Sequence, residues 1–203
     1  MPEPPNEVLA FRFPRDKTVE VARVRSTLIA ASRHGIRSMG WEDRYLAALP
    51  KELHLELQML TAGSWVPLSL AVAHYTACDA MALGKHEMNA IGEDVSLRTQ
   101  KTFVGTLGKA VSGAGATPWL LMMNMHRIWD RMFEGGDTAV YKIGEKEALV
   151  LLAGCPPLEL TYFRVGLLAY YRALARILSR IAYTNEVPAH RASGRIGFRV
   201  SWV

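Results

Sequence analysis

The fold is decided near the C-terminus, by the stretch 157-PLELTYFRVGLLAYYRALARILSR-180. Its large apolar residues recur at helical spacing and form one stripe: Phe163, Leu167, Tyr170, Tyr171, Leu174 and Ile177. A stripe of this width is typical of a helix that packs against a core. Pro156 and Pro157 suit the first helical turn, which needs no backbone N–H donor. The pattern predicts a long amphipathic helix over 157–180.

Strand-like runs flank this helix on both sides. Residues 138–143 and 147–153 are rich in β-forming residues and are joined through Gly144. Residues 181–187 and 195–203 repeat the arrangement around Gly194. Runs of this length bounded by turn residues indicate two β-hairpins that bracket the helix.

The chain before residue 138 alternates like a strand only over 18–25, and helical patterns follow it. We expect helices at 27–34, ending at Gly35, then two short ones from Trp41 and from Pro50, and one opened by Trp65-Val66-Pro67 and running to about residue 81. A helical pattern over 86–110 contains Gly92, Gly105 and Gly108, which either break it or permit close helix contacts. Thr117-Pro118 begins a helix over 119–133, and Gly135-Gly136 ends it.

This order of elements indicates the fold class. Helices gathered between one early strand and a late antiparallel group favour α+β over a parallel-sheet fold. We therefore expect an antiparallel sheet of about four to five strands covered by a layer of helices. The predicted order is strand, helices, hairpin, long helix, hairpin.

The length and composition suit one domain. The chain has 203 residues, half of them hydrophobic, which allows a sizeable core. Residues 1–16 are rich in proline and are expected to form a flexible tail, followed by a single α+β domain over 17–203. The start lacks the pattern of a signal peptide, and no window offers eighteen uncharged apolar residues, so we expect a cytoplasmic protein without stable membrane insertion. Cys78 and Cys155 are expected to be buried free thiols.

The net charge of +5 arises from the C-terminal segment. Residues 156–203 contain seven arginines but only Glu159 and Glu186 as acids. Arg172, Arg176 and Arg180 fall four apart, which is typical of a solvated helix face but also offers a surface to a protein partner. No lysine-rich run and no aromatic and basic interleaving is present, so nucleic acid is not expected to be a partner.

No catalytic or metal-binding motif rises above background. The loop around Gly113 and Gly115 lacks the third glycine of a dinucleotide fingerprint and follows no predicted strand. His74 and Cys78 lie four apart, but no second pair completes a metal site. We therefore expect a protein that is not an enzyme, with no metal and no cofactor.

The most unusual composition lies in 119-WLLMMNMHRIW-129. Together with the long helix, it predicts a soft apolar pocket lined by Trp119, Met122, Met123, His126, Trp129, Phe163, Leu167 and Tyr170. The alternative is that the methionines only fill gaps in the core. His126 is the only histidine on an apolar, sulfur-rich stretch, so iron, if bound at all, should bind there.

Short motifs carry a resemblance to known proteins: Val24-Arg25-Ser26-Thr27, Leu49-Pro50, Trp65-Val66-Pro67-Leu68, Ile91-Gly92 and Phe198-Arg199-Val200-Ser201-Trp202. Through them the chain resembles an uncharacterised family of myxobacterial proteins of about its own length. More distantly, the order of elements resembles the superfamily of 4-vinyl reductase domains, transport protein particle subunits and haem nitric oxide sensors. That resemblance implies helices over an antiparallel sheet, with a cavity for an apolar or acyl small molecule.

Two departures from this superfamily bear on cofactors. The Tyr-x-Ser-x-Arg clasp for haem propionates is absent, and so are the paired cysteines of 4-vinyl reductase domains near the end of the chain. The resemblance therefore favours a non-enzymatic ligand-binding or sensory module in bacterial signalling. The alternative is a protein-interaction adaptor whose core is filled by its own side chains. A homodimer is expected in either case, by helix contacts or through the strand 197–203 if it lies at a sheet edge.

Overall fold

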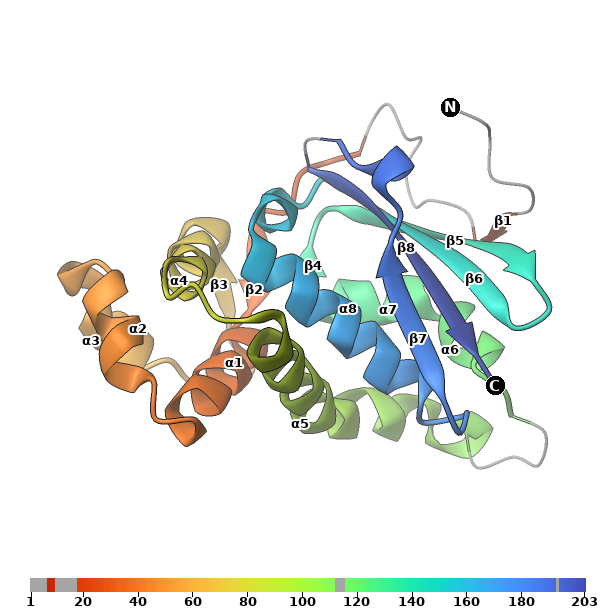
Figure 1. Cartoon of the computed structure of the whole chain (residues 1–203), viewed down its shortest axis with the longest axis horizontal. Coiled ribbons are helices and arrows are strands. Elements are labelled where there is room, and N and C mark those ends of the chain that lie inside the picture. The colour runs from red at the N-terminus through yellow and green to blue at the C-terminus, as the bar shows by residue number, and fades with distance from the viewer. Residues whose placement is uncertain (1–6, 10–17, 112–115, 193) are drawn as a thin grey trace.

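The C-terminal strands and one N-terminal strand form an antiparallel sheet (Figure 1). The computed structural model describes residues 7–9, 18–111, 116–192 and 194–203. The strand order is β1-β5-β6-β8-β7. The strands are β1 (Glu7–Leu9), β5 (Asp137–Gly144), β6 (Glu147–Ala153), β7 (Ala182–Glu186) and β8 (Arg195–Trp202). Both predicted hairpins are confirmed, as β5 with β6 and β7 with β8, and so is the α+β class.

The register of the sheet gives it an apolar inner face. Val150 of β6 lies opposite Val140 of β5 and Phe198 of β8, and all three side chains are fully buried. Because side chains alternate along a strand, these three lie on one face of the sheet, and that face packs against the helices. The other face carries a small separate apolar cluster around Tyr141 and Leu149.

The remaining elements are mostly helical. They are α1 (Ser26–Ser38), α2 (Glu42–Ala48), α3 (His54–Gln58), α4 (Leu68–Ala80), α5 (Lys85–Val111), α6 (Trp119–Met122), α7 (Met125–Met132) and α8 (Thr161–Ala175), with 3-10 turns η2 (Lys51–Leu53), η3 (Pro156–Glu159) and η4 (Pro188–His190). A small antiparallel sheet in the order β3-β2-β4 joins β2 (Arg23–Arg25), β3 (Trp65–Pro67) and β4 (Phe133–Glu134). None of the described helices is both long and apolar enough to cross a membrane.

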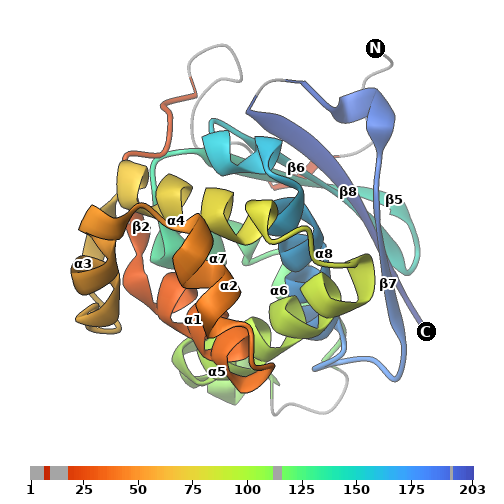
Figure 2. The same cartoon turned by 60° about the vertical axis from the view of Figure 1, so that its left-hand side comes forward.

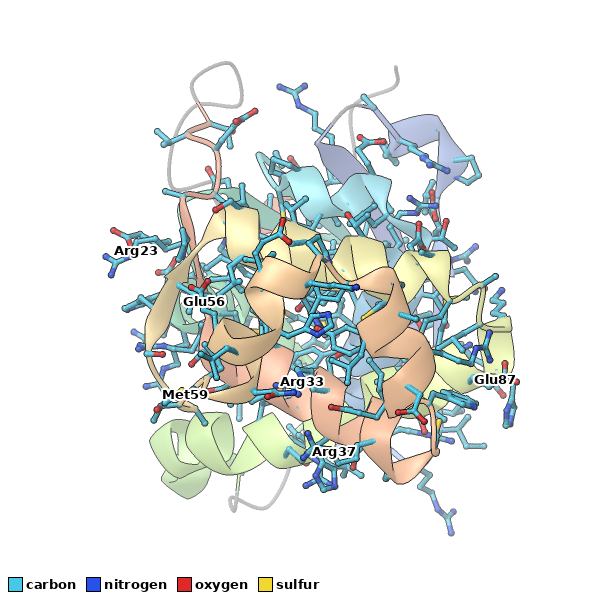
Figure 3. All side chains as sticks on the ribbon, turned by 90° about the vertical axis from the view of Figure 1, so that its left-hand side faces the viewer. Arg23, Arg33, Arg37, Glu56, Met59 and Glu87 are labelled. Atoms are coloured by element: carbon cyan, nitrogen blue, oxygen red, sulfur yellow. The ribbon has the colours of Figure 1, made fainter. Side chains whose placement is uncertain are left out.

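Helices α1 to α4 gather at the end of the molecule away from the large sheet, and α5 extends from them to the underside of α8 (Figure 1). Figure 2 shows α1, α2 and α4 in front of α7 and α8. Figure 3 views this helical end directly and places Arg33 and Arg37 on the same side of α1. Both guanidinium groups lie 3.1 Å from Glu42 Oε1 of α2, so they join α1 to its neighbour.

Helix α8 lies between the sheet and the other helices. Tyr171 faces the sheet, with its ring 5.9 Å from that of Phe198. Phe163, by contrast, faces the helices, with its ring 4.8 Å from that of Tyr75 of α4. The expected single stripe is therefore divided between two faces, because α8 is buried on both sides.

Several helix boundaries differ from those expected. The long helix is shorter, because its first residues form η3 and it ends at Ala175, so Ile177 lies beyond it. The strand expected over 18–25 is limited to β2, and the residues expected to open the helix at 65 form β3 instead. Gly35 does not end α1, because the helix continues to Ser38. A Cβ atom on Gly35 would lie 3.1 Å from the side chain of Ile91 in α5, so this glycine lies at a close helix contact.

Helix α5 is continuous despite its glycines. For Gly92, the expectation that a glycine permits a close helix contact is correct. A Cβ atom on Gly92 would lie 2.8 Å from the Cα atom of Gly166, so the absence of a side chain lets α5 and α8 touch. The helix expected over 119–133 is broken at Met123 and Asn124 into α6 and α7. The chain then leaves β4 through Gly135, whose φ of 94° favours glycine.

Candidate functional site

A small cavity lies between α1, α5 and α8. Its described lining residues are Leu28, Ser32, Tyr75, Met88, Ile91, Gly92, Val95, Met132, Phe133, Tyr162, Phe163, Gly166, Leu167 and Tyr170. Its volume is about 50 Å³. Ligand pockets usually enclose roughly 300 to 1,000 Å³, so the cavity must widen before it can hold a ligand larger than water.

Two glycines give the cavity its shape. Gly92 brings α5 against α8 at one point of the interface. A Cβ atom on Gly166, the residue of α8 that Gly92 approaches, would have no neighbouring heavy atom within 4 Å. Gly166 therefore leaves space where every other helical residue would place a side chain, and this space is part of the cavity.

Ser32 of α1 and Tyr162 of α8 form the polar wall. Ser32 Oγ lies 2.7 Å from the Tyr162 hydroxyl and 3.0 Å from His74 Nε2 of α4. His74 Nδ1 lies 2.9 Å from the Tyr45 hydroxyl of α2. These four side chains thus join four helices in one buried hydrogen-bonded chain.

The imidazole in this chain is neutral. Burial lowers the pKa of His74 to about 3, and the nearby Arg33 guanidinium adds to the effect. A neutral imidazole has one donor and one acceptor nitrogen, which matches its two hydroxyl partners. Cys78 Sγ lies 3.7 Å from His74 Nε2, but burial raises the pKa of its thiol well above the ordinary range, so it is not an activated nucleophile.

A larger cleft of about 650 Å³ adjoins the cavity. It is lined by Arg25, Thr27, Leu28, Ala62, Gly63, Thr99, Arg131 and Met132 among the described residues. Leu28 and Met132 belong to both linings. Thr99 of the cleft donates a hydrogen bond of 3.3 Å to the hydroxyl of Tyr170, which lines the cavity. Among the described residues, the cleft and the cavity are therefore linked by two shared apolar side chains and one hydrogen bond.

The predicted site residues fall into two groups. Phe163, Leu167 and Tyr170 line the cavity together. The residues expected from 119–129 are not among the described lining residues of the cavity. Met122 and Trp129 are buried in the core, and Trp119 packs against Trp202. Met123 is 51% exposed, and His126 is half-buried. Their part in binding stays a prediction.

The sequence interpretation missed the residues of α1, α4 and α5 at this site. Ser32 and His74 are 42 positions apart, and no local pattern connects them. The feature of the sequence that could have indicated the site is Gly166, in the middle of a strongly apolar helix. A glycine at such a position lowers helix stability by about 1 kcal/mol relative to alanine. Such a residue usually has a packing or functional reason.

The cavity does not fit a haem group. Haem iron takes an imidazole, thiolate, thioether or phenolate as axial ligand. No histidine or cysteine is among the described lining residues, and burial raises the pKa of the Tyr75, Tyr162 and Tyr170 hydroxyls. Met88 and Met132 offer only thioethers, in a space of about 50 Å³. Among the described residues there is also no cluster of three or more histidine, cysteine or acidic side chains that could hold a metal ion.

The fold is that of H-NOX domains. The chain is similar to a mutant of the H-NOX protein from K. algicida in its unliganded Fe(II) form, with a TM-score of 0.63, 9% identity and coverage of 88% of this chain and 96% of that one. An oxygen-binding H-NOX domain related to soluble guanylate cyclases aligns with a TM-score of 0.55, 12% identity and coverage of 88% and 94%. A T. tengcongensis H-NOX variant aligns with a TM-score of 0.56, 13% identity and coverage of 88% and 97%.

These likenesses concern the fold alone, because the identities are low. The sequence matches no family profile and no curated protein. The expected likeness to the superfamily that includes haem nitric oxide sensors is thus confirmed at the level of the fold. The resemblance to a myxobacterial family stays a prediction.

Proposed function

We propose that this protein is a non-enzymatic sensory module that binds an apolar or acyl small molecule in the cavity between α1, α5 and α8. The fold shared with H-NOX domains supports a ligand-binding role in signalling. The observation that carries the proposal is the space beside Gly166, in an apolar cavity that shares the described lining residues Leu28 and Met132 with a larger cleft. A cytoplasmic location belongs to the same proposal.

The position of the cavity suits a sensor. Most of its described lining residues come from α1, α4 and α5 on one side and from α8, which lies against the sheet, on the other. A ligand that enters there separates α1 from α8 and must replace the Ser32 to Tyr162 hydrogen bond or bend around it. Binding energy then shifts the equilibrium between two arrangements of these layers, which is what a sensor requires.

Native mass spectrometry of gently purified protein tests the proposal. We expect a retained apolar molecule on the wild type and its loss from Gly166→Leu, whose side chain fills the cavity. Arg176→Leu is the matched control, because Arg176 is exposed just beyond the same helix. A ligand retained equally by Gly166→Leu would contradict the proposed site.

A second candidate is a protein-interaction adaptor that binds no ligand. The observation that favours it is the small size of the cavity, about 50 Å³. It predicts that the wild type has the mass of the bare chain and that Gly166→Leu leaves the partner interaction intact. Arg172 and Arg176 offer less to such a partner than expected, because both bind Glu93 of α5.

Self-association is part of both proposals. The final strand is not at the edge, since β8 lies between β6 and β7. One of the two edge strands is β7, which contains Tyr183, and Ile181 and Val203 lie close to it. The three side chains of Ile181, Tyr183 and Val203 are 44%, 55% and 61% exposed. We propose pairing of this edge with that of a second copy. Light scattering should then show a dimer that Tyr183→Lys converts to a monomer, because a charged edge discourages pairing.

A further inference from the structure

The cleft next to the cavity is basic. Arg25 of β2 and Arg131 of α7 both line it, with the hydroxyl-bearing residues Thr27 and Thr99. None of the described lining residues is acidic. Two guanidinium groups at one cleft give it a positive charge that suits an anion.

Arg25 is held in place before any ligand arrives. Its Nη1 donates a hydrogen bond of 2.8 Å to the carbonyl oxygen of Gly63, and its Nε donates one of 3.4 Å to that of Arg131. The guanidinium also lies 4.1 Å above the centre of the Trp65 ring. A guanidinium fixed in this way loses little freedom when it binds a planar anion such as a carboxylate.

The barrier between the cleft and the cavity can yield. Met132 is unbranched and has three rotatable bonds, so it can change rotamer at low cost. Its side chain and that of Leu28 are buried, and both line the cleft as well as the cavity. A change of the Met132 rotamer would join the cleft to the cavity, whose described lining includes Ile91, Val95 and Gly166.

We infer that the ligand is a single-chain anionic amphiphile, a long-chain carboxylate whose head group binds at Arg25 and Arg131 and whose tail enters the cavity beside Gly166. This inference rests on the proposed function and narrows it to one chemical class. The structure supplies both ends: the guanidinium groups of Arg25 and Arg131 in the cleft, the first of them held in place, and an apolar space beside Gly166. A neutral apolar molecule would occupy the apolar space but would make no use of the arginines.

Isothermal titration of the full chain with dodecanoate and with dodecanol tests the inference, because the two probes share a tail and differ in the head group. At pH 8 we expect dodecanoate to bind about 10-fold or more tightly, the usual effect of a charge-assisted hydrogen bond. Added salt should weaken dodecanoate binding and leave dodecanol binding nearly unchanged.

Variants locate the two ends of the ligand. Arg131→Gln and Arg25→Gln should each reduce the affinity for dodecanoate about 10-fold and leave that for dodecanol unchanged. Arg23→Gln is the control, since Arg23 lies on the same strand as Arg25 but pairs with Glu134 and points away from the molecule (Figure 3). Gly166→Leu should abolish binding of both probes. Thermal unfolding checks that each variant is folded. If Arg25→Gln does not fold, Arg131→Gln alone tests the head-group site.

The outcomes separate the two claims. Equal affinities for both probes, unchanged by Arg131→Gln but lost in Gly166→Leu, would overturn the anionic head group and leave the apolar site standing. Dodecanoate binding that survives Gly166→Leu would overturn the placement of the tail. Binding of neither probe would contradict the proposed function itself.

Discussion

Ser32 Oγ and the Tyr162 hydroxyl lie 2.7 Å apart, and this hydrogen bond joins α1 to α8 at the wall of the cavity. Both side chains are buried, and Ser32 alone also contacts His74. The serine thus satisfies two partners on two other helices. Its loss should therefore disturb the buried chain more than the loss of the tyrosine hydroxyl.

Substitution at these two positions gives the first prediction. Ser32→Ala leaves two buried polar groups without their partner, and we expect a loss of about 2 to 4 kcal/mol in the free energy of unfolding. Tyr162→Phe removes one hydroxyl while Ser32 keeps His74, so we expect about 0.5 to 1.5 kcal/mol. Urea denaturation measures both, and a larger loss for Tyr162→Phe would contradict the assignment of Ser32 as the shared partner.

The two glycines of the α5 and α8 contact should respond to alanine with opposite signs. Gly166→Ala places a methyl group in open space and gains helix propensity, so we expect a stabilisation of up to about 1 kcal/mol. Gly92→Ala forces a methyl group against Gly166 and Ala169, and overpacking of this kind typically costs about 1 to 3 kcal/mol. Thermal unfolding midpoints compare them, and a shift of the same sign in both would disprove the described contact.

Much of the architecture was predictable from sequence, because it depends on local patterns. Runs of β-forming residues around Gly144 and around Gly194 predicted the two hairpins. The apolar period of α8 predicted Phe163, Leu167 and Tyr170 on the helical side of the site. These residues follow from spacing alone, since each element must bury its own apolar face.

The other half of the candidate site was not predictable, because it depends on tertiary packing. The break at Met123 and Asn124 ends the single helix on which the expected pocket wall was based, and it leaves Met123 exposed. Tyr162 contacts Ser32 across 130 positions, which no period within one element can show. The arginines of the cleft are brought together by a short strand and the end of a helix, and neither has a distinctive pattern.

The buried imidazole predicts a dependence of stability on pH. The pKa of His74 is about 3 in the folded chain and near 6.5 when unfolded, so between these values the unfolded state binds the extra proton. Stability is therefore full above about pH 6.5 and falls as the pH decreases toward 3. For this group alone the loss at pH 5 is about 2 kcal/mol relative to pH 7.5.

His74→Gln provides the comparison, because it removes the titrating group and keeps hydrogen-bonding capacity toward Ser32 and Tyr45. Urea denaturation of both proteins at pH 5 and pH 7.5 should show the smaller change in the variant. An equal change in both would mean that other groups cause the dependence and that His74 does not titrate as described.

The last prediction concerns the two sides of the organising helix. Leu167 is buried and lines the cavity, so Leu167→Ala should enlarge an existing space that its neighbours already fail to fill. We expect a loss of about 2 to 5 kcal/mol, the usual range for truncating a buried leucine. Arg176→Ala should change stability by less than about 0.5 kcal/mol, because its side chain is 49% exposed and its ion pair with Glu93 is screened by water.

Arg172 lies between these extremes. Its side chain is only 23% exposed and donates hydrogen bonds to both Glu93 and Asn89 of α5, so Arg172→Ala should cost about 1 kcal/mol rather than nothing. Chemical denaturation of the three variants side by side gives the order Leu167→Ala, Arg172→Ala, Arg176→Ala. Equal midpoints for Leu167→Ala and Arg176→Ala would mean that the buried face of α8 is wrongly assigned, and the cavity assigned to that face would be wrong with it.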